Sequence, residues 1–216
     1  MSMHGKTAIA AKLPHPLILA SASPRRAQLL REAGYTFTVQ VSPAKEPALR
    51  PRDVPIAIWP ATLAYIKAAA VQRHIQSLPA PRNSSNKSAP IILGADTIVT
   101  LHNRVLNKPR NRAHARHMLI RLFDQTHQVI TGIALLCGDH IRLATATSVC
   151  YATPPTAAWL ENYLDSHLWR GKAGAYGIQD DAHSSDPFIT LLAGEFTNVM
   201  GLPMSLLEHE LQTFLR

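Results

Sequence analysis

The chain has 216 residues, of which 46% are hydrophobic and 17% are charged, proportions that fit one ordinary domain with a core of its own. It contains no run of about 18 apolar residues, and its N-terminus lacks an apolar signal segment, so we expect a cytoplasmic protein with no membrane contact. The 22 basic and 14 acidic residues give a formal net charge of +8, which favours polyanionic partners such as nucleic acid or phosphorylated small molecules.

Cysteine and histidine usage argues against a disulfide framework and against a zinc motif. Cys137 and Cys150 each stand in an apolar or β-branched run, and we expect two buried thiols on neighbouring strands. None of the 11 histidines forms an HExxH or an H-x-x-x-H pattern, and His114 and His117 stand among arginines. We therefore expect most histidines to be solvated.

The N-terminal half alternates short apolar runs with helical patterns. Residues 1–16 are interpreted as an extension, and 17–216 as a single domain. Within it we predict a strand over 17–21, a turn and helix over 23–33, a strand over 35–41 and an Ala-rich helix over 61–74 with Lys67 near its centre. The Pro- and Ser-rich residues 78–90 are predicted to be a loop insertion, and 91–99 a β-branched strand.

The C-terminal half continues the same alternation. We predict helices over 112–123, 154–164 and 204–214, strands over 128–136, 141–151 and 188–192, and a glycine-rich loop over 171–177. This order predicts a three-layer α/β domain in which a mixed central sheet is flanked by helices.

The first candidate site is Ser23-Pro24-Arg25-Arg26, between an apolar strand and the start of a helix. Free backbone N–H groups and the helix dipole favour an anion there, and two guanidinium groups beside them would clamp a phosphate. The alternative is that Ser23 only caps the helix while both arginines are solvated.

The second candidate is Asp96, within the Gly94-Ala-Asp-Thr97 segment of the most apolar predicted strand. An unpaired charge in such a place would be expensive, so something must compensate it. A bound cation would do so, and a carboxylate beside a metal-bound water can act as a general base. The alternative is an aspartate at a strand end that accepts backbone N–H groups.

Two loops complete the candidates. Lys108-Pro109 follows a short strand, and the lysine either reaches a phosphate or is solvated. The three glycines of residues 171–177 allow a close approach of the backbone to a ligand, although such a loop also serves as a plain turn.

Together these segments resemble the Maf family of nucleotide pyrophosphatases over residues 17–211. Six fragments occur in the family's order and spacing. They are Leu19-Ala-Ser-Ala-Ser-Pro-Arg-Arg26 with Leu29-Leu30, Gly94-Ala-Asp-Thr97, Lys108-Pro109, residues 127–132, Gly171-Lys-Ala-Gly-Ala-Tyr-Gly-Ile-Gln179 and Asn198-Val-Met-Gly-Leu-Pro203.

The resemblance implies a two-lobed α/β fold with a nucleotide-binding cleft, similar to that of inosine triphosphatases, and usually a homodimer. It implies hydrolysis of a nucleoside triphosphate to the monophosphate and pyrophosphate with a divalent cation, Mg, Mn or Co. Asp96 matches the family's catalytic carboxylate, and Glu46 falls where the family keeps a metal-binding glutamate. The resemblance thus implies that Glu46 and Asp96 hold the metal. The family's phosphate-handling positions are matched by Ser23, Arg25, Arg26, Lys67, Lys108 and Lys172.

The chain is most similar to the family branch that acts on dTTP and UTP. The residues that carry this similarity are Arg25, Thr97 and Gln179, and they favour pyrimidine triphosphates, CTP included, over 7-methyl-GTP. A glutamine offers both a donor and an acceptor to a base edge. The chain departs from the family pattern at Lys45, where an acidic residue is frequent, and at Asp180, where a glycine follows the Ile-Gln pair.

Two other functions remain open at this point. One is a nucleotide-binding division regulator with little turnover, and the intact Asp96 and Glu46 argue against it. The other is a basic nucleic-acid-binding protein. No aromatic residues interleave with basic runs to make a stacking platform, so we expect no specific nucleic acid partner.

Overall fold

The computed structural model describes residues 13–45, 47, 50–78, 89–180 and 187–215. The predicted metal ligand Glu46, most of the predicted extension 1–16 and most of the predicted insertion 78–90 lie outside the described residues.

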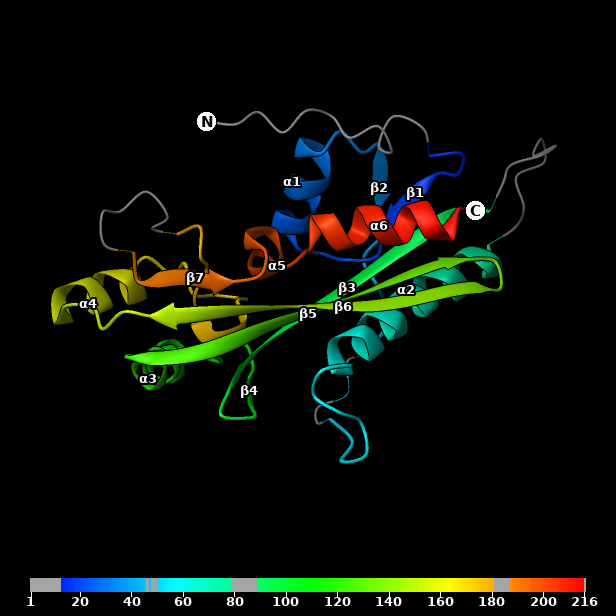
Figure 1. The fold of residues 1–216 in the computed structure, drawn as a ribbon. Coiled ribbons are helices and arrows are strands. Elements are labelled where there is room, and N and C mark those ends of the chain that lie inside the picture. Colours follow the sequence, from blue (N-terminus) through cyan, green and yellow to red (C-terminus); the bar gives the residue numbers. More distant parts are fainter. Residues whose placement is uncertain (1–12, 46, 48–49, 79–88, 181–186, 216) are drawn as a thin grey trace. The chain divides into compact units, whose positions relative to one another are not determined.

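The described part of the chain contains a mixed sheet of seven strands, with the order β2-β1-β3-β5-β6-β7 and β4 paired with β3. Strand β1 is parallel to β2 and β3, whereas β4 and β7 run antiparallel to their partners. The predicted α/β class with a mixed sheet is confirmed (Figure 1). The strands are β1 Leu17–Leu19, β2 Phe37–Val39, β3 Ile91–Leu101, β4 Arg104–Leu106, β5 Gln125–Cys137, β6 His140–Ala152 and β7 Ile189–Ala193. The helices are α1 Pro24–Glu32, α2 Trp59–Ser77, α3 Arg112–Leu122, α4 Ala157–Asp165, the 3-10 helix η2 Ala173–Ala175, α5 Phe196–Met200 and α6 Met204–Phe214.

The chain divides into two compact units, as expected for a two-lobed fold. The first unit comprises Met1–Asp96, Gly132–Thr145 and Met204–Arg216, and the second Thr97–Thr131 and Ala146–Pro203. The divisions fall inside β3, β5 and β6, so these long strands contribute residues to both units.

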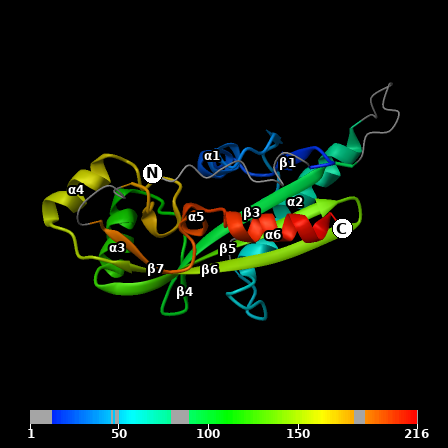
Figure 2. The ribbon, with the colours of Figure 1, turned by 45° about the horizontal axis from the view of Figure 1, so that its top comes forward.

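In the first unit, α2 lies against one face of the sheet and α6 against the other (Figures 1 and 2). The approach of α2 to β3 is unusually close, because a Cβ atom at Gly94 would lie 2.1 Å from the backbone oxygen of Ala64. The alanines of α2 have small side chains, so this face of the helix allows the strand to come close. A small apolar cluster fills the contact, with Ala20, Ala64, Ala68, Ala69, Val71, Ile92, Ala134 and Leu136.

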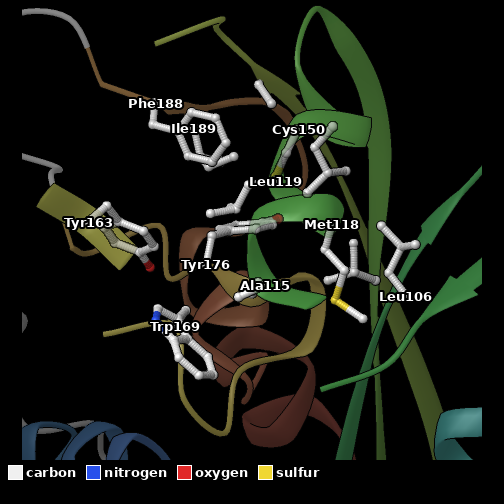
Figure 3. Packing of buried hydrophobic residues seen from close by; sticks show 14 of the residues in the cluster. Leu106, Ala115, Met118, Leu119, Cys150, Tyr163, Trp169, Tyr176, Phe188 and Ile189 are labelled. Carbon is white, nitrogen blue, oxygen red and sulfur yellow. The ribbon is translucent and has the colours of Figure 1, made fainter. Parts of the chain in front are cut away.

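The second unit has a core rich in aromatic side chains (Figure 3). Tyr176, from the glycine-rich loop, lies between Phe188, Leu119 and Tyr163 in this view. Trp159 stacks on Tyr163 with ring centroids 4.9 Å apart. The predicted glycine-rich loop is therefore anchored in the core by its tyrosine.

The element boundaries differ from the predictions by two or three residues at several places, among them both ends of β2 and of α2 and the starts of β5 and α4. Helix α2 begins at Trp59 because a proline at position 60 suits the first helical turn. Helix α4 begins three residues later than predicted, because the Thr156 side chain accepts the N–H of Trp159 and caps the helix there. The short helix α5 was not predicted.

Both cysteines are free, as predicted, but only Cys150 is buried, whereas Cys137 is half-buried at the end of β5. Most of the described histidines are exposed, and His127 is the buried exception. No helix in the described residues is both long and apolar enough to cross a membrane.

Candidate active site

The start of α1 holds the first predicted phosphate site. Ser23 occupies the N-cap position, yet its side chain makes no capping hydrogen bond, so the capping alternative is wrong. Arg26 is only 9% exposed, and its Nη1 donates to the Ser21 hydroxyl at 2.9 Å. Arg25 is half-buried. Arg26 is therefore held in place, and the alternative in which both arginines are solvated does not describe it.

Asp96 is paired with Lys67. The Nζ atom of Lys67 lies 2.5 Å from Oδ1 of Asp96, and both side chains are nearly buried. Asp96 lies in the middle of β3, so the alternative of an aspartate at a strand end is also wrong. Lys67, a predicted phosphate contact, thus also compensates the charge of the Asp96 carboxylate.

The close helix–strand approach explains this pair. Lys67 follows Ala64 by one helical turn, and Asp96 lies on the same face of β3 as Gly94, two residues earlier. Because Gly94 lets the helix backbone come close, the lysine reaches the carboxylate.

The start of α1 also lies in the first unit, where α1 follows the carboxyl end of β1, the neighbour of β3. Strands β1 and β3 are parallel, with Leu19 opposite Leu93, and the N–H of Ala20 donates to the Leu93 oxygen at 2.8 Å. Residues 21–23 therefore leave β1 beside the part of β3 that leads to Asp96. Carboxyl ends of parallel strands commonly form ligand sites.

In the second unit, Thr97 belongs to a chain of hydroxyl groups. Its Oγ1 lies 2.9 Å from Oγ1 of Thr131, which donates to the backbone oxygen of Asn198 at 3.0 Å. The Asn198 side chain in turn donates to the Val129 oxygen at 3.1 Å. Three of the fragments recognised in the sequence thus meet at one network.

Lys172 is buried and tied to Asp180. Its Nζ atom lies 2.5 Å from both carboxylate oxygens, and the two side chains are 8% and 7% exposed. Gln179 donates to the same carboxylate from Nε2 at 3.2 Å. A Cβ atom at Gly177 would lie 2.6 Å from Nε2 of Gln179 and 2.8 Å from Nζ of Lys172, so a larger residue at this position would displace the ends of these side chains.

A buried polar group lies beneath the glycine-rich loop. The Nε2 atom of His127 is 2.6 Å from the Tyr176 hydroxyl. Burial lowers the pKa of His127 to about 4 and raises the pKa of Tyr176 well above its ordinary value. Burial also raises the pKa of the Cys150 thiol to about 11. All three groups are therefore neutral near pH 7.

The remaining predicted residues are placed as follows. Lys108 is exposed, and its predecessor Asn107 accepts the N–H of Gly174 through its backbone oxygen at 3.3 Å, so the Lys108 segment borders the glycine-rich loop. Sequence reasoning gave no role to Ser21 or Tyr163. Ser21 and Arg26 are five residues apart in one strand–helix turn, and this spacing could have indicated their hydrogen bond. No local pattern indicated that Tyr163 contacts Asp180.

The described residues contain no cluster of three or more histidine, cysteine, aspartate or glutamate side chains able to hold a metal ion. Asp96 uses only Oδ1 for Lys67, and Oδ2 accepts no hydrogen bond from the described residues. Mg²⁺ is commonly held by one or two carboxylates together with water and substrate phosphates. The chemistry of this site fits such an ion.

Comparison with known proteins points in the same direction. A family model described as Maf-like protein matches residues 16–214. A dTTP/UTP pyrophosphatase of Symbiobacterium thermophilum is 40% identical over 188 residues, which cover 87% of this chain and 88% of that protein. The dTTP/UTP pyrophosphatase of Salinibacter ruber is 38% identical over 195 residues, covering 89% and 88%, and that of Bacillus anthracis 36% over 207 residues, covering 92% and 95%. With a match across almost its whole length, the chain belongs to the Maf family.

Proposed function

We propose that this protein is a nucleoside triphosphate pyrophosphatase that converts dTTP and UTP to the monophosphate and pyrophosphate. The supporting observation is similarity over most of the chain to three proteins named dTTP/UTP pyrophosphatase. It is combined with a nearly buried aspartate–lysine pair in β3, the strand that lies beside β1, which leads into the basic start of α1.

The first unit supplies charge to bind a triphosphate. The N-terminus of α1 carries the positive end of the helix dipole, which favours phosphate oxygens. Arg26 is oriented by Ser21 before any ligand arrives, and Arg25 follows Pro24 on the same turn. Groups held in place in advance stabilise developing charge without reorganising.

Asp96 is the proposed general base. Its Oδ2 atom, which the lysine leaves available, would accept the proton of the water that attacks the α-phosphorus. Lys67 holds the other oxygen and so orients the carboxylate. Asp96 and Glu46 would hold the divalent cation, Mg, Mn or Co, which supplies Lewis-acid stabilisation of phosphate charge when bound.

The test is pyrophosphate release from dTTP, UTP, CTP, GTP, ATP and 7-methyl-GTP with Mg or Mn, and with chelator. We expect turnover of pyrimidine triphosphates that stops with chelator. Asp96→Asn is expected to lower kcat by at least about 100-fold, the range of a lost general base. The matched control is Asp139→Asn, which removes the same charge from an exposed turn and should leave kcat unchanged.

Three results would count against the proposal. Turnover in Asp96→Asn equal to the parent would remove the aspartate from the chemistry. Nucleotide binding without turnover by the parent would support a regulator instead. RNA binding that persists in Asp96→Asn, with no turnover in the parent, would support a nucleic-acid-binding protein.

A further inference from the structure

The carboxylate of Asp180 accepts hydrogen bonds from four groups of the second unit. Lys172 donates to both of its oxygens. The Tyr163 hydroxyl and the Gly177 N–H donate to Oδ2, at 2.6 and 3.1 Å. Gln179 donates from Nε2 to Oδ1 at 3.2 Å. Asp180 thus connects the residue predicted to contact phosphate with the residue predicted to contact the base.

This contact determines the orientation of the Gln179 side chain. An ionised carboxylate can only accept hydrogen bonds, so the NH₂ group of the amide must face Asp180 and the carbonyl oxygen Oε1 must point elsewhere. Oε1 is buried and has no hydrogen-bond partner among the described residues. A buried acceptor without a donor is unfavourable, and a ligand N–H would satisfy it.

We propose that Asp180 is a positioning residue that presents Gln179 to the base as an acceptor. This inference rests on the proposed function. Uracil and thymine carry an N–H at ring position 3, whereas cytosine carries an acceptor nitrogen there. An amide held with its oxygen toward the base therefore accepts from uracil or thymine and repels cytosine, which selects dTTP and UTP over CTP.

Asp180→Asn tests this because the two oxygens of Asp180, which both accept from Lys172, otherwise have different neighbours. The oxygen near Gly177 faces a backbone N–H that cannot be reversed, so the new amide keeps its oxygen there. Its NH₂ group then takes the position of Oδ1, opposite Gln179. Gln179 must rotate its amide to accept from it, and thereby turns its own NH₂ group toward the base.

The expected result is a fall in the ratio of kcat/KM for UTP to kcat/KM for CTP. Exchanging a matched for a mismatched hydrogen bond changes this ratio by about ten- to a hundredfold. Asp180→Gly, which releases the amide without reversing it, should lower the ratio by less. It also serves as the second variant where the asparagine variant does not fold.

Tyr163→Phe is the matched control. It removes a donor to the same carboxylate but leaves the contact with Gln179 in place. We expect a lower melting temperature and an unchanged ratio. A structural role for Asp180 alone predicts that all these variants lower stability and none changes the ratio.

The proposal is overturned if both Asp180 variants keep the parent's ratio, or if Tyr163→Phe changes it as much as Asp180→Asn. Failure of the proposed function is distinct, because the parent itself would release no pyrophosphate. In that case the ratio is taken from the dissociation constants of UMP and CMP, and equal changes or no change would again overturn the proposal.

Discussion

His127 should make the stability of the protein depend on pH. The imidazole is 2% exposed and contacts the Tyr176 hydroxyl in the core of the second unit. Burial disfavours the imidazolium form, so the folded state holds the pKa at about 4, against 6.5 for the unrestrained side chain. Between these values the unfolded chain binds a proton that the folded chain does not, and lowering the pH therefore favours unfolding.

The size of the effect follows from the shift. A difference of about 2.5 pKa units corresponds to a loss of about 3 kcal/mol in the free energy of unfolding once the pH is below 4. Between pH 7 and pH 5 the expected loss is about 2 kcal/mol. Tyr176 and Cys150, the neighbouring titratable groups, have raised pKa values and stay neutral throughout this range.

The assay is urea unfolding at pH 7, 6 and 5 for the parent and for His127→Gln, which keeps a polar partner for the tyrosine but cannot titrate. The variant should be less stable at pH 7, and its stability should fall by about 2 kcal/mol less than that of the parent by pH 5. His140→Gln, at an exposed position, is the control and should follow the parent. Parallel curves for the parent and His127→Gln would refute the reasoning.

Two substitutions test the packing of the first unit. Gly94→Ala places a methyl group 2.1 Å from the Ala64 oxygen, which forces α2 away from the strand. We expect a loss of about 3 kcal/mol in the free energy of unfolding, measured with urea, and reduced turnover. Lys67→Met leaves the nearly buried Asp96 carboxylate without its cation, and should cost about 3 kcal/mol. Adding Asp96→Asn should restore part of that loss.

Gly94→Ala and Lys67→Met each have a control substitution of the same kind at an exposed position. Gly138→Ala adds a methyl group where no atom lies within 4 Å, so only its positive φ opposes the change, at a cost of about 1 kcal/mol. Arg116→Met breaks an exposed pair with Glu161, and because water and salt screen such a pair it should change the stability little. Equal losses in test and control variants would show that close packing and burial are not responsible.

The sequence by itself determined the family, the α/β class and most elements. Periodicity, β-branched runs and prolines act within a few residues, so α1, α3 and the strand containing Asp96 were predicted near their observed places. The prediction of an element's boundary was wrong where two local signals competed. At α4 the prolines favoured an early start, whereas the hydroxyl of Thr156 supplied the cap.

Tertiary structure decided which charges meet. Lys67 and Asp96 are 29 residues apart, and their pairing depends on a close approach between α2 and β3 that no local pattern specifies. The motif of Lys172 predicts a phosphate contact, and only the fold shows that the carboxylate of Asp180, eight residues later, pairs with this lysine. The energy of a buried charge depends on everything around it, and those surroundings come from segments distant in the sequence. For this reason the residue types indicated which chemical groups the site contains, and only the fold showed which of these groups contact one another.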